Sequence, residues 1–173
     1  MPARIWTIGH STRSLEEFID LLSGHGIDFL ADVRRLPGSR RFPHFDRETL
    51  EPALGARGID YHHLPQLGGR RRPAPDSVNL GWRNTAFRGY ADYMQTPPWC
   101  EGLAELLALA DRRALAMMCS EAVPWRCHRS LIADALTIRG IEVLDILGNG
   151  PAKPHRLTPF ARVDGDRLTY PAG

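Results

Sequence analysis

The chain has 173 residues, of which 43% are hydrophobic and 24% are charged. This length and composition are typical of one globular domain and exclude a disordered, collagen-like or coiled-coil chain. No apolar run approaches the roughly 18 residues that a membrane helix needs, and the first residues lead into a strand-like segment rather than a signal peptide. We therefore expect a soluble, cytoplasmic protein with no membrane partner.

The net charge is only +2, but the positive charge comes almost entirely from arginine, with 21 arginines against one lysine. Arginine recognises carboxylate and phosphate groups through a rigid, two-pronged set of donors, although a GC-rich genome also produces arginine-rich chains. Three cysteines, Cys100, Cys119 and Cys127, are too few for a disulfide framework. In a reducing compartment we expect them to be thiols, thiolates or metal ligands.

The N-terminal part alternates strand and helix patterns. Ser14 and Glu17 form a capping box for a helix that stops at the glycines after it, and Pro52 is expected to prevent the next helix from starting much before Thr49. The predicted elements are a strand at 5–10, a helix from 15 to about 24, a strand at 27–34, a helix from about 49 to 57 and a strand at 59–64.

The C-terminal part begins with a long loop, expected at 68–84, of a length that is usually a lid or a binding loop. The apolar run at 114–118 has the pattern of a central parallel strand. The other predicted elements are helices at 87–94, from Thr96 to about 110 and at 128–139, a strand at 141–147 and a terminal hairpin within 160–170.

Alternating strands and helices predict the α/β fold class: a mostly parallel five-stranded sheet with helices on both faces and a short C-terminal hairpin. We expect residues 1–150 to form the domain and 151–173 to be an extension packed on it. In such folds the binding crevice lies at the carboxyl ends of the strands. The polar residues expected at those ends are His10, Asp32, Arg34, His62, His63, Cys119 and Glu121.

The segment 119–130 has the densest group of reactive side chains and leads into a helix. Free N–H groups and the dipole at a helix N-terminus favour anions and lower the pKa of a nearby thiol. We therefore predict an anion-binding site at the start of this helix, and we include in it Arg70 from the long loop at 68–84. Its residues are Arg126, Cys127, His128, Arg129 and Arg70.

Six motifs in order resemble the DUF488 family, a family of unknown function. They are Thr7-Ile8-Gly9-His10-Ser11, Asp32-Val33-Arg34, Leu67-Gly68-Gly69, the segment 87–94, Cys119-Ser120-Glu121 and the segment 125–129. The resemblance runs from about residue 4 to residue 147. It implies a compact α/β domain with its signature residues at the strand ends, and no settled substrate or mechanism.

These residues are compatible with three different functions. The first is an enzyme of unknown reaction, a hydrolase or a transferase, acting on an anionic phosphorylated or nucleotide-derived substrate; its catalytic residues are His10, Asp32, Arg34, Cys119 and Glu121. The second is a metal site on Cys119, Cys127 and His128, with Glu121 or His10 as a further ligand. The third is a non-catalytic nucleotide or nucleic-acid binder that uses loop arginines and aromatic residues.

Each of these residues also has a simpler structural interpretation. Asp32 and Arg34 share a strand face and can simply pair, while a cysteine at the end of a buried strand is most often a small hydrophobic residue. His62 and His63 point to opposite faces, so at most one of them reaches the crevice. The sequence leaves the cofactor, the metal and the oligomeric state open, and we lean towards the enzyme.

Overall fold

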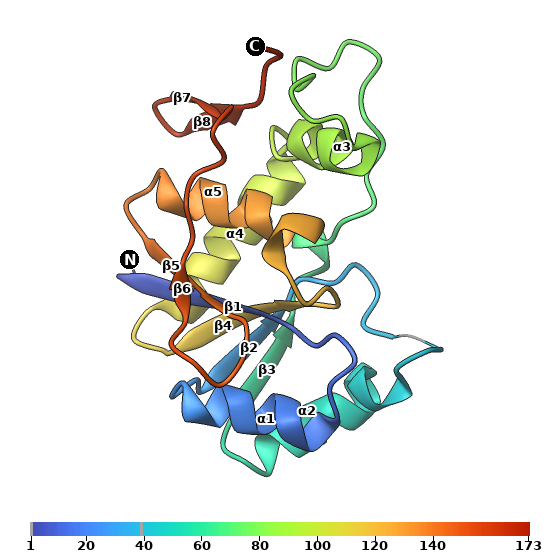
Figure 1. Cartoon of the computed structure of the whole chain (residues 1–173), viewed down its shortest axis with the longest axis vertical. Helices are drawn as coiled ribbons and strands as arrows, with labels where there is room; N and C mark the ends of the chain where they lie inside the picture. Colours follow the sequence, from blue (N-terminus) through green and yellow to red (C-terminus); the bar gives the residue numbers. More distant parts are fainter. Residues whose placement is uncertain (1, 39) are drawn as a thin grey trace.

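Five short segments form the parallel strands of one sheet (Figure 1). The computed structural model describes residues 2–38 and 40–173. Every residue of β2 and β4 is buried, because helices cover both faces of the sheet. The strand order is β3-β2-β4-β1-β5-β6, and the strands are β1 (Arg4–Gly9), β2 (Phe29–Asp32), β3 (Asp60–His63), β4 (Leu115–Cys119), β5 (Glu142–Ile146) and β6 (Lys153–Pro154).

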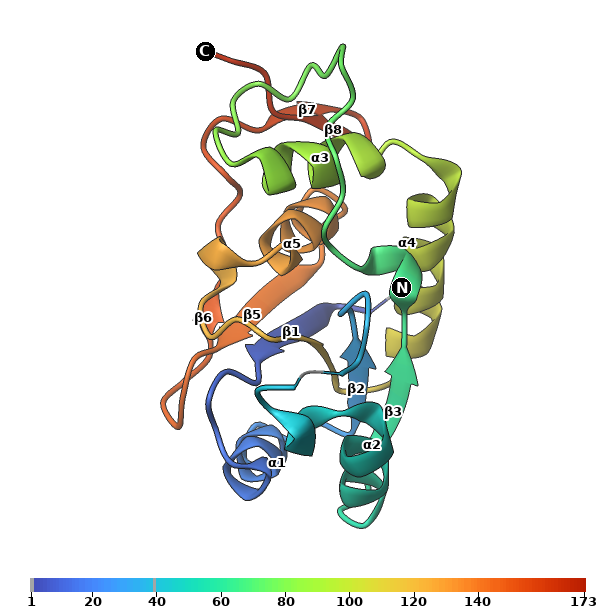
Figure 2. The same ribbon diagram turned by 90° about the vertical axis from the view of Figure 1, so that its right-hand side faces the viewer.

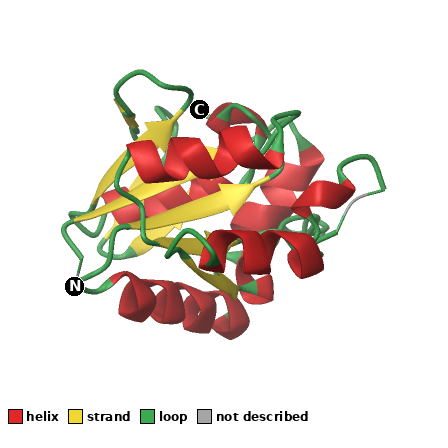
Figure 3. Cartoon of the chain, turned by 90° about the horizontal axis from the view of Figure 1, so that it is seen from below, coloured by secondary structure: helices red, strands yellow, loops and turns green. Residues whose placement is uncertain are grey.

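The helices lie in two layers, one on each face of the sheet (Figures 2 and 3). On one side, α1 (Leu15–Gly24) and α2 (Arg47–Gly55) bury Phe18, Leu22, Leu50 and other residues against the sheet. On the other side lie α4 (Pro97–Ala110) and α5 (Arg129–Thr137), with α3 (Thr85–Tyr93) packed beyond them. The predicted α/β class, with a mostly parallel sheet covered on both faces, is confirmed.

Helix α2 starts at Arg47, two residues earlier than Pro52 led us to expect. The carbonyl of Asp46 accepts hydrogen bonds from the backbone N–H groups of Thr49 and Leu50, so the first turn is closed upstream of the proline. Pro52 therefore lies inside the helix, where it lacks one backbone donor. Burial of Leu50 on the sheet offsets that loss.

The chain after residue 150 adds one strand that the sequence did not predict. Strand β6 pairs antiparallel with β5, with Lys153 opposite Asp145. The predicted hairpin is confirmed as β7 (Arg162–Asp164) and β8 (Arg167–Thr169), with Gly165 at a φ of +66° in its turn. Buried Asp134 of α5 holds this tail, accepting hydrogen bonds from Tyr170 Oη and His155 Nε2, both at 2.7 Å, and from Thr158 N.

Candidate active site

A cavity of about 930 Å³ opens at the carboxyl ends of β1, β2 and β4, where polar loops follow the apolar strands. Three 3-10 turns, η1 (Pro43–Phe45), η2 (Pro65–Leu67) and η3 (Pro124–Arg126), lie in the loops after β2, β3 and β4. The described residues that line the cavity come mainly from five segments: 10–12, 34–42, 69–70, 86–90 and 119–128.

Most of the sequence-predicted site residues meet in this cavity. The register pairs Gly9 of β1 with Cys119 of β4, and His10 N donates a hydrogen bond of 2.9 Å to the carbonyl of Cys119. The strand-end rule therefore correctly placed His10 and Cys119 together. The predicted residues that line the cavity are His10, Arg34, Arg70, Cys119, Glu121, Arg126, Cys127 and His128.

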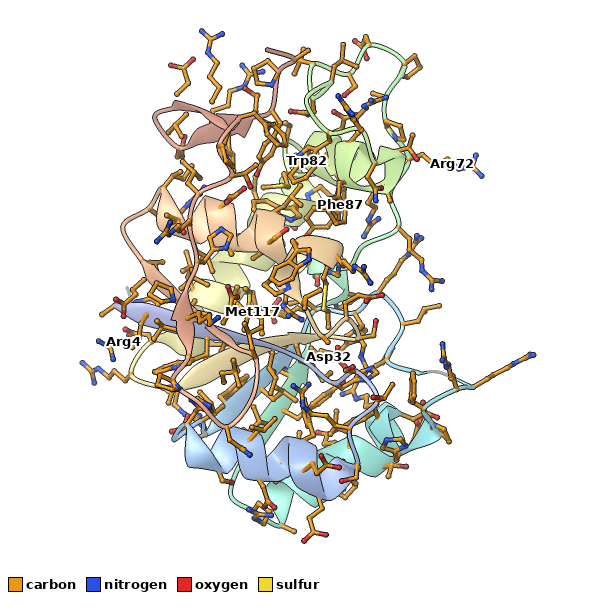
Figure 4. All side chains as sticks on the ribbon, in the orientation of Figure 1. Arg4, Asp32, Arg72, Trp82, Phe87 and Met117 are labelled. Carbon is orange, nitrogen blue, oxygen red and sulfur yellow. A yellow bond between two sulfur atoms is a disulfide. The ribbon has the colours of Figure 1, made fainter. Side chains whose placement is uncertain are left out.

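Asp32 and Arg34 form a buried ion pair. This pairing is the simpler alternative that the sequence offered to a catalytic role for the two residues. Arg34 Nε and Nη2 donate to the two carboxylate oxygens of Asp32 at 2.9 and 2.8 Å, and Nη2 also donates to the carbonyl of Phe45. Tyr61 Oη donates to the same carboxylate, and burial together with Asp32 raises the pKa of Tyr61. Asp32, labelled in Figure 4, is fully buried, so its oxygens are engaged behind the cavity wall.

His10 is a neutral base with a free lone pair. Its Nδ1 lies 2.9 Å from the carbonyl of Ser11, which can only accept, so Nδ1 carries the proton and Nε2 is an acceptor. Nε2 is buried and has no hydrogen-bond partner within the described part of the chain. Burial lowers the pKa of His10 to about 4, and its ring stacks on Phe45 at 4.3 Å.

The sulfurs of Cys119 and Cys127 are in direct contact and form a disulfide pair, whereas we expected separate thiols, thiolates or metal ligands. Turn η3 returns the chain to the end of β4 and brings Cys127 beside Cys119. Across residues 2–38 and 40–173, no three His, Cys, Asp or Glu side chains are grouped as metal ligands. Cys100, on α4, is a free and exposed thiol.

Arg129 does not face the predicted anion site; it is fully buried behind the loop that follows β4. Its Nη1 donates to Cys119 Sγ at 2.8 Å and to the carbonyl of Glu121 at 2.7 Å, and Nη2 donates to the carbonyl of Ala122. Burial lowers the pKa of Arg129 to about 10. Gly9 makes this packing possible, because a Cβ there would lie 1.6 Å from the Glu121 carbonyl oxygen and 2.8 Å from Arg129 Nη1.

His128 contacts Cys127, the second cysteine of the disulfide. Its Nε2 donates to the carbonyl of Val33 at 2.9 Å, which leaves Nδ1 as an acceptor 3.5 Å from Cys127 Sγ. Burial lowers the pKa of His128 to about 4. Gly69 packs flat against the ring, since a Cβ there would lie 2.9 Å from Nδ1.

The cavity is electropositive. Of the described residues that line it, one, Glu121, is acidic, whereas four arginines at its rim are exposed: Arg35, Arg41, Arg70 and Arg126. Other arginines in the loop runs are used elsewhere: Arg71 packs on the ring of Tyr93 at 3.8 Å, and Arg88 donates to the carbonyl of Trp82. Arg72 points away from the body of the molecule in Figure 4.

Sequence reasoning missed two features of the site. It did not single out Trp125, which lines the cavity with 65% of its surface exposed, or Tyr61 as a partner of Asp32. It expected at most one of His62 and His63 to reach the crevice; His62 Nε2 contacts Glu105, and His63 Nε2 donates to the carbonyl of Arg34. Neither histidine is among the described residues that line the cavity.

The family model for the domain of unknown function DUF488 matches residues 14–136. The chain belongs to the DUF488 family. The match covers the segment from the start of α1 to residue 136 in α5, and it includes Asp32, Arg34, both disulfide cysteines and Arg129. Comparison with curated proteins and with solved structures finds no significant match. Among the described residues, no helix is both long enough and apolar enough to span a membrane.

Proposed function

We propose that this DUF488 protein is a cytoplasmic enzyme, a hydrolase or a transferase, that acts on an anionic, phosphorylated or nucleotide-derived substrate. The observation that carries the proposal is the buried Nε2 of neutral His10, which has no partner among the described residues, in a side chain that lines a cavity with four exposed arginines at its rim. A binding module has no need for an unpartnered imidazole base, whereas general base catalysis requires one that is unprotonated near neutral pH.

The arginines supply the recognition of the anion. Arg35, Arg70 and Arg126 reach the cavity from three separate loops, so a bound phosphate or carboxylate would be contacted from several sides. Guanidinium groups bind such anions through two parallel hydrogen bonds. Phe42, Phe87 and Trp125 give the same cavity aromatic surfaces on which a base can stack.

His10 and Cys119 supply the chemistry. His10 Nε2 is the acceptor for a proton taken from water or from a substrate hydroxyl. Cys119 acts as the nucleophile when its sulfur is not bonded to Cys127, with the Arg129 guanidinium 2.8 Å away to stabilise a thiolate. In this role Arg34 and Asp32 are positioning residues that hold the floor of the cavity.

The test is to measure binding first and turnover second. Inorganic phosphate, pyrophosphate, nucleoside monophosphates and short oligonucleotides are titrated into the reduced protein at low and high salt. We expect binding that weakens with salt, and a loss of about tenfold or more when Arg70 and Arg126 are changed to alanine. Arg167→Ala, which removes an exposed arginine on β8, is the matched control.

Turnover of the bound compounds is then followed by phosphorus NMR. We expect His10→Asn and Cys119→Ser to abolish turnover while binding persists. Binding without turnover of any compound would favour the second candidate, a nucleotide or nucleic-acid binder, for which the aromatic side chains at the cavity are the supporting observation. Salt-independent binding, or none at all, would contradict both.

A further inference from the structure

The disulfide between Cys119 and Cys127 lies in the wall of the cavity, with both cysteines among its lining residues. The two sulfurs come from one segment, and the return of the chain through η3 brings them together. Both side chains are nearly buried, with Cys119 2% and Cys127 5% exposed, so a small thiol would have to reach the sulfurs from the cavity that they line. Its chemistry then depends on what surrounds each sulfur.

The two sulfurs have different surroundings. Cys119 Sγ accepts a hydrogen bond from Arg129 Nη1, and the other hydrogen bonds of this guanidinium go to backbone carbonyls, while its Nε has no partner in the described part of the chain. The charges of Asp145 and Glu121 act on Arg129, but no carboxylate among the described residues hydrogen-bonds to its guanidinium. A thiolate at Cys119 would be the anion in direct contact with this buried cation. Cys127 Sγ lies 3.5 Å from a neutral ring nitrogen, Nδ1 of His128, and accepts a hydrogen bond of 3.5 Å from the backbone N–H of Arg129 rather than from its guanidinium.

We propose that Cys119 and Cys127 form a redox-active pair that exchanges with small-molecule thiols, with Cys119 as the thiolate and Cys127 as the sulfur that is attacked. This goes beyond the proposed function, because it requires no anionic substrate.

The exchange balances in two steps. An incoming thiolate attacks Cys127 Sγ, the bond between Cys127 and Cys119 breaks, and its electron pair leaves with Cys119 as a thiolate beside Arg129. A second thiolate then attacks the small-molecule sulfur of the mixed disulfide, releasing a small-molecule disulfide and the Cys127 thiolate. That thiolate takes a proton from solvent, and the resulting thiol is placed to donate to His128 Nδ1. Two thiols are oxidised to one disulfide, and the protein gains two electrons.

Cys119 is assigned as the leaving group because the sulfur that is better stabilised as a thiolate leaves faster. The same asymmetry makes Cys119 the attacking thiolate when the reduced protein meets an oxidised small-molecule disulfide. The Arg129 contact is therefore the feature to test.

The first measurement uses the Cys100→Ser protein, which removes the exposed free thiol. The protein is equilibrated in ratios of reduced to oxidised dithiothreitol, and its thiols are trapped by alkylation and counted by mass spectrometry. We expect both remaining cysteines to change together, without unfolding, and oxidised dithiothreitol to restore the bond. Reduction that occurs only in denaturant, or reduced protein that does not re-form the bond, would overturn the proposal.

The second measurement compares the two sulfurs by thiolate absorbance near 240 nm. In the same background, Cys127→Ser leaves Cys119 alone and Cys119→Ser leaves Cys127 alone. We expect the Cys119 thiol to titrate below about pH 7.5, against about 8.5 for an ordinary thiol, and below Cys127. A Cys119 midpoint at or above that of Cys127 would refute the assignment, and neither variant alters Arg129.

The third measurement changes the cation. In the Cys127→Ser protein, Arg129→Gln should raise the Cys119 midpoint to about 8.5 or above, and Arg129→Lys should restore part of the shift. The matched control is Arg139→Gln, just beyond the end of the same helix, where the guanidinium donates to the carbonyl of Ala135. An equal shift in the control would contradict a specific role of Arg129. If Arg129→Gln does not fold, the comparison of the two single-cysteine proteins still shows which of the two thiols is the more acidic.

Discussion

Two arginines are buried beside the same cavity, and they are satisfied in opposite ways. Arg34 donates two hydrogen bonds to the carboxylate of Asp32, which Tyr61 also contacts, so its charge is neutralised within the fold. Arg129 donates to two carbonyls and to the sulfur of Cys119, with no carboxylate among the described groups that it hydrogen-bonds. The first arginine has a carboxylate as its hydrogen-bond partner, whereas the second has the charges of Asp145 and Glu121 nearby and the sulfur of Cys119 in contact.

This difference gives a way to distinguish residues that stabilise the fold from residues that set the acidity of a thiol at this site. A buried ion pair that is complete loses much stability when one partner is removed, because the other charge is left uncompensated. A buried cation against sulfur instead changes the acidity of that sulfur. Substitutions near Arg34 should therefore appear as unfolding free energy, and substitutions near Arg129 as altered thiol chemistry.

The largest effect is expected from Asp32→Asn, which leaves the Arg34 guanidinium without its counter-charge. We expect a loss of about 3–5 kcal/mol in the free energy of unfolding, measured by denaturant titration. The control is Asp20→Asn at the exposed pair with Arg57, where the loss should stay below about 1 kcal/mol. Equal losses at both positions would mean that the Arg34 pair is no more than a surface contact.

The next effect is a pH dependence set by His10. Because burial lowers its pKa to about 4 in the folded chain, from 6.5, the unfolded chain binds more protons between these values. Stability is therefore complete above pH 6.5 and falls as the pH drops towards 4, by up to about 3 kcal/mol from this group. His128 contributes in the same direction, since its pKa is also lowered to about 4.

His10→Asn provides the control for this pH dependence. The variant should flatten part of the loss between pH 6.5 and 4, as measured by unfolding at a series of pH values. A curve identical to that of the unchanged protein would show that His10 is protonated equally in the folded and unfolded chains.

A smaller effect is expected from Gly9→Ala. The added methyl group would overlap the carbonyl of Glu121 and must push the loop after β4 away from Arg129, at a cost of about 1–3 kcal/mol. The Cys119 thiol pKa should rise with it. Gly24→Ala, at the end of α1 with open space around its Cβ, is the matched control and should be neutral or slightly stabilising.

The smallest effect is expected from Tyr61→Phe, which removes one of the hydrogen bonds to Asp32 and keeps the ion pair. We expect a loss of about 1.5 kcal/mol, with no change in the acidity of Cys119. A change in thiol acidity would show that the two arginines are coupled through the cavity wall.

Sequence patterns were sufficient for the parts of the fold and site that depend on periodicity and register. The apolar run of β4 and the strand-end rule brought His10 and Cys119 together, because parallel strands end at one edge. The pairing of Asp32 with Arg34 followed from the alternation of side chains along β2.

The features that sequence reasoning missed depend on long-range paths and rotamers. The pairing of Cys119 with Cys127 depends on how tightly η3 turns back, which no spacing rule states. Position at a helix start predicted that Arg129 would face an anion, but Gly9 leaves room for its side chain on the inner side of the loop. Tyr61 joins Asp32 from a neighbouring strand, and that contact carries no local signal.

Strand β6 also determines how the sheet meets other molecules. It occupies the outer side of β5 with a lysine and a proline, and Pro154 has no N–H to offer an incoming strand. An edge of this composition discourages sheets from joining edge to edge. Removing residues from Lys153 onward would uncover the backbone of β5, and the consequence to watch for is aggregation at high protein concentration.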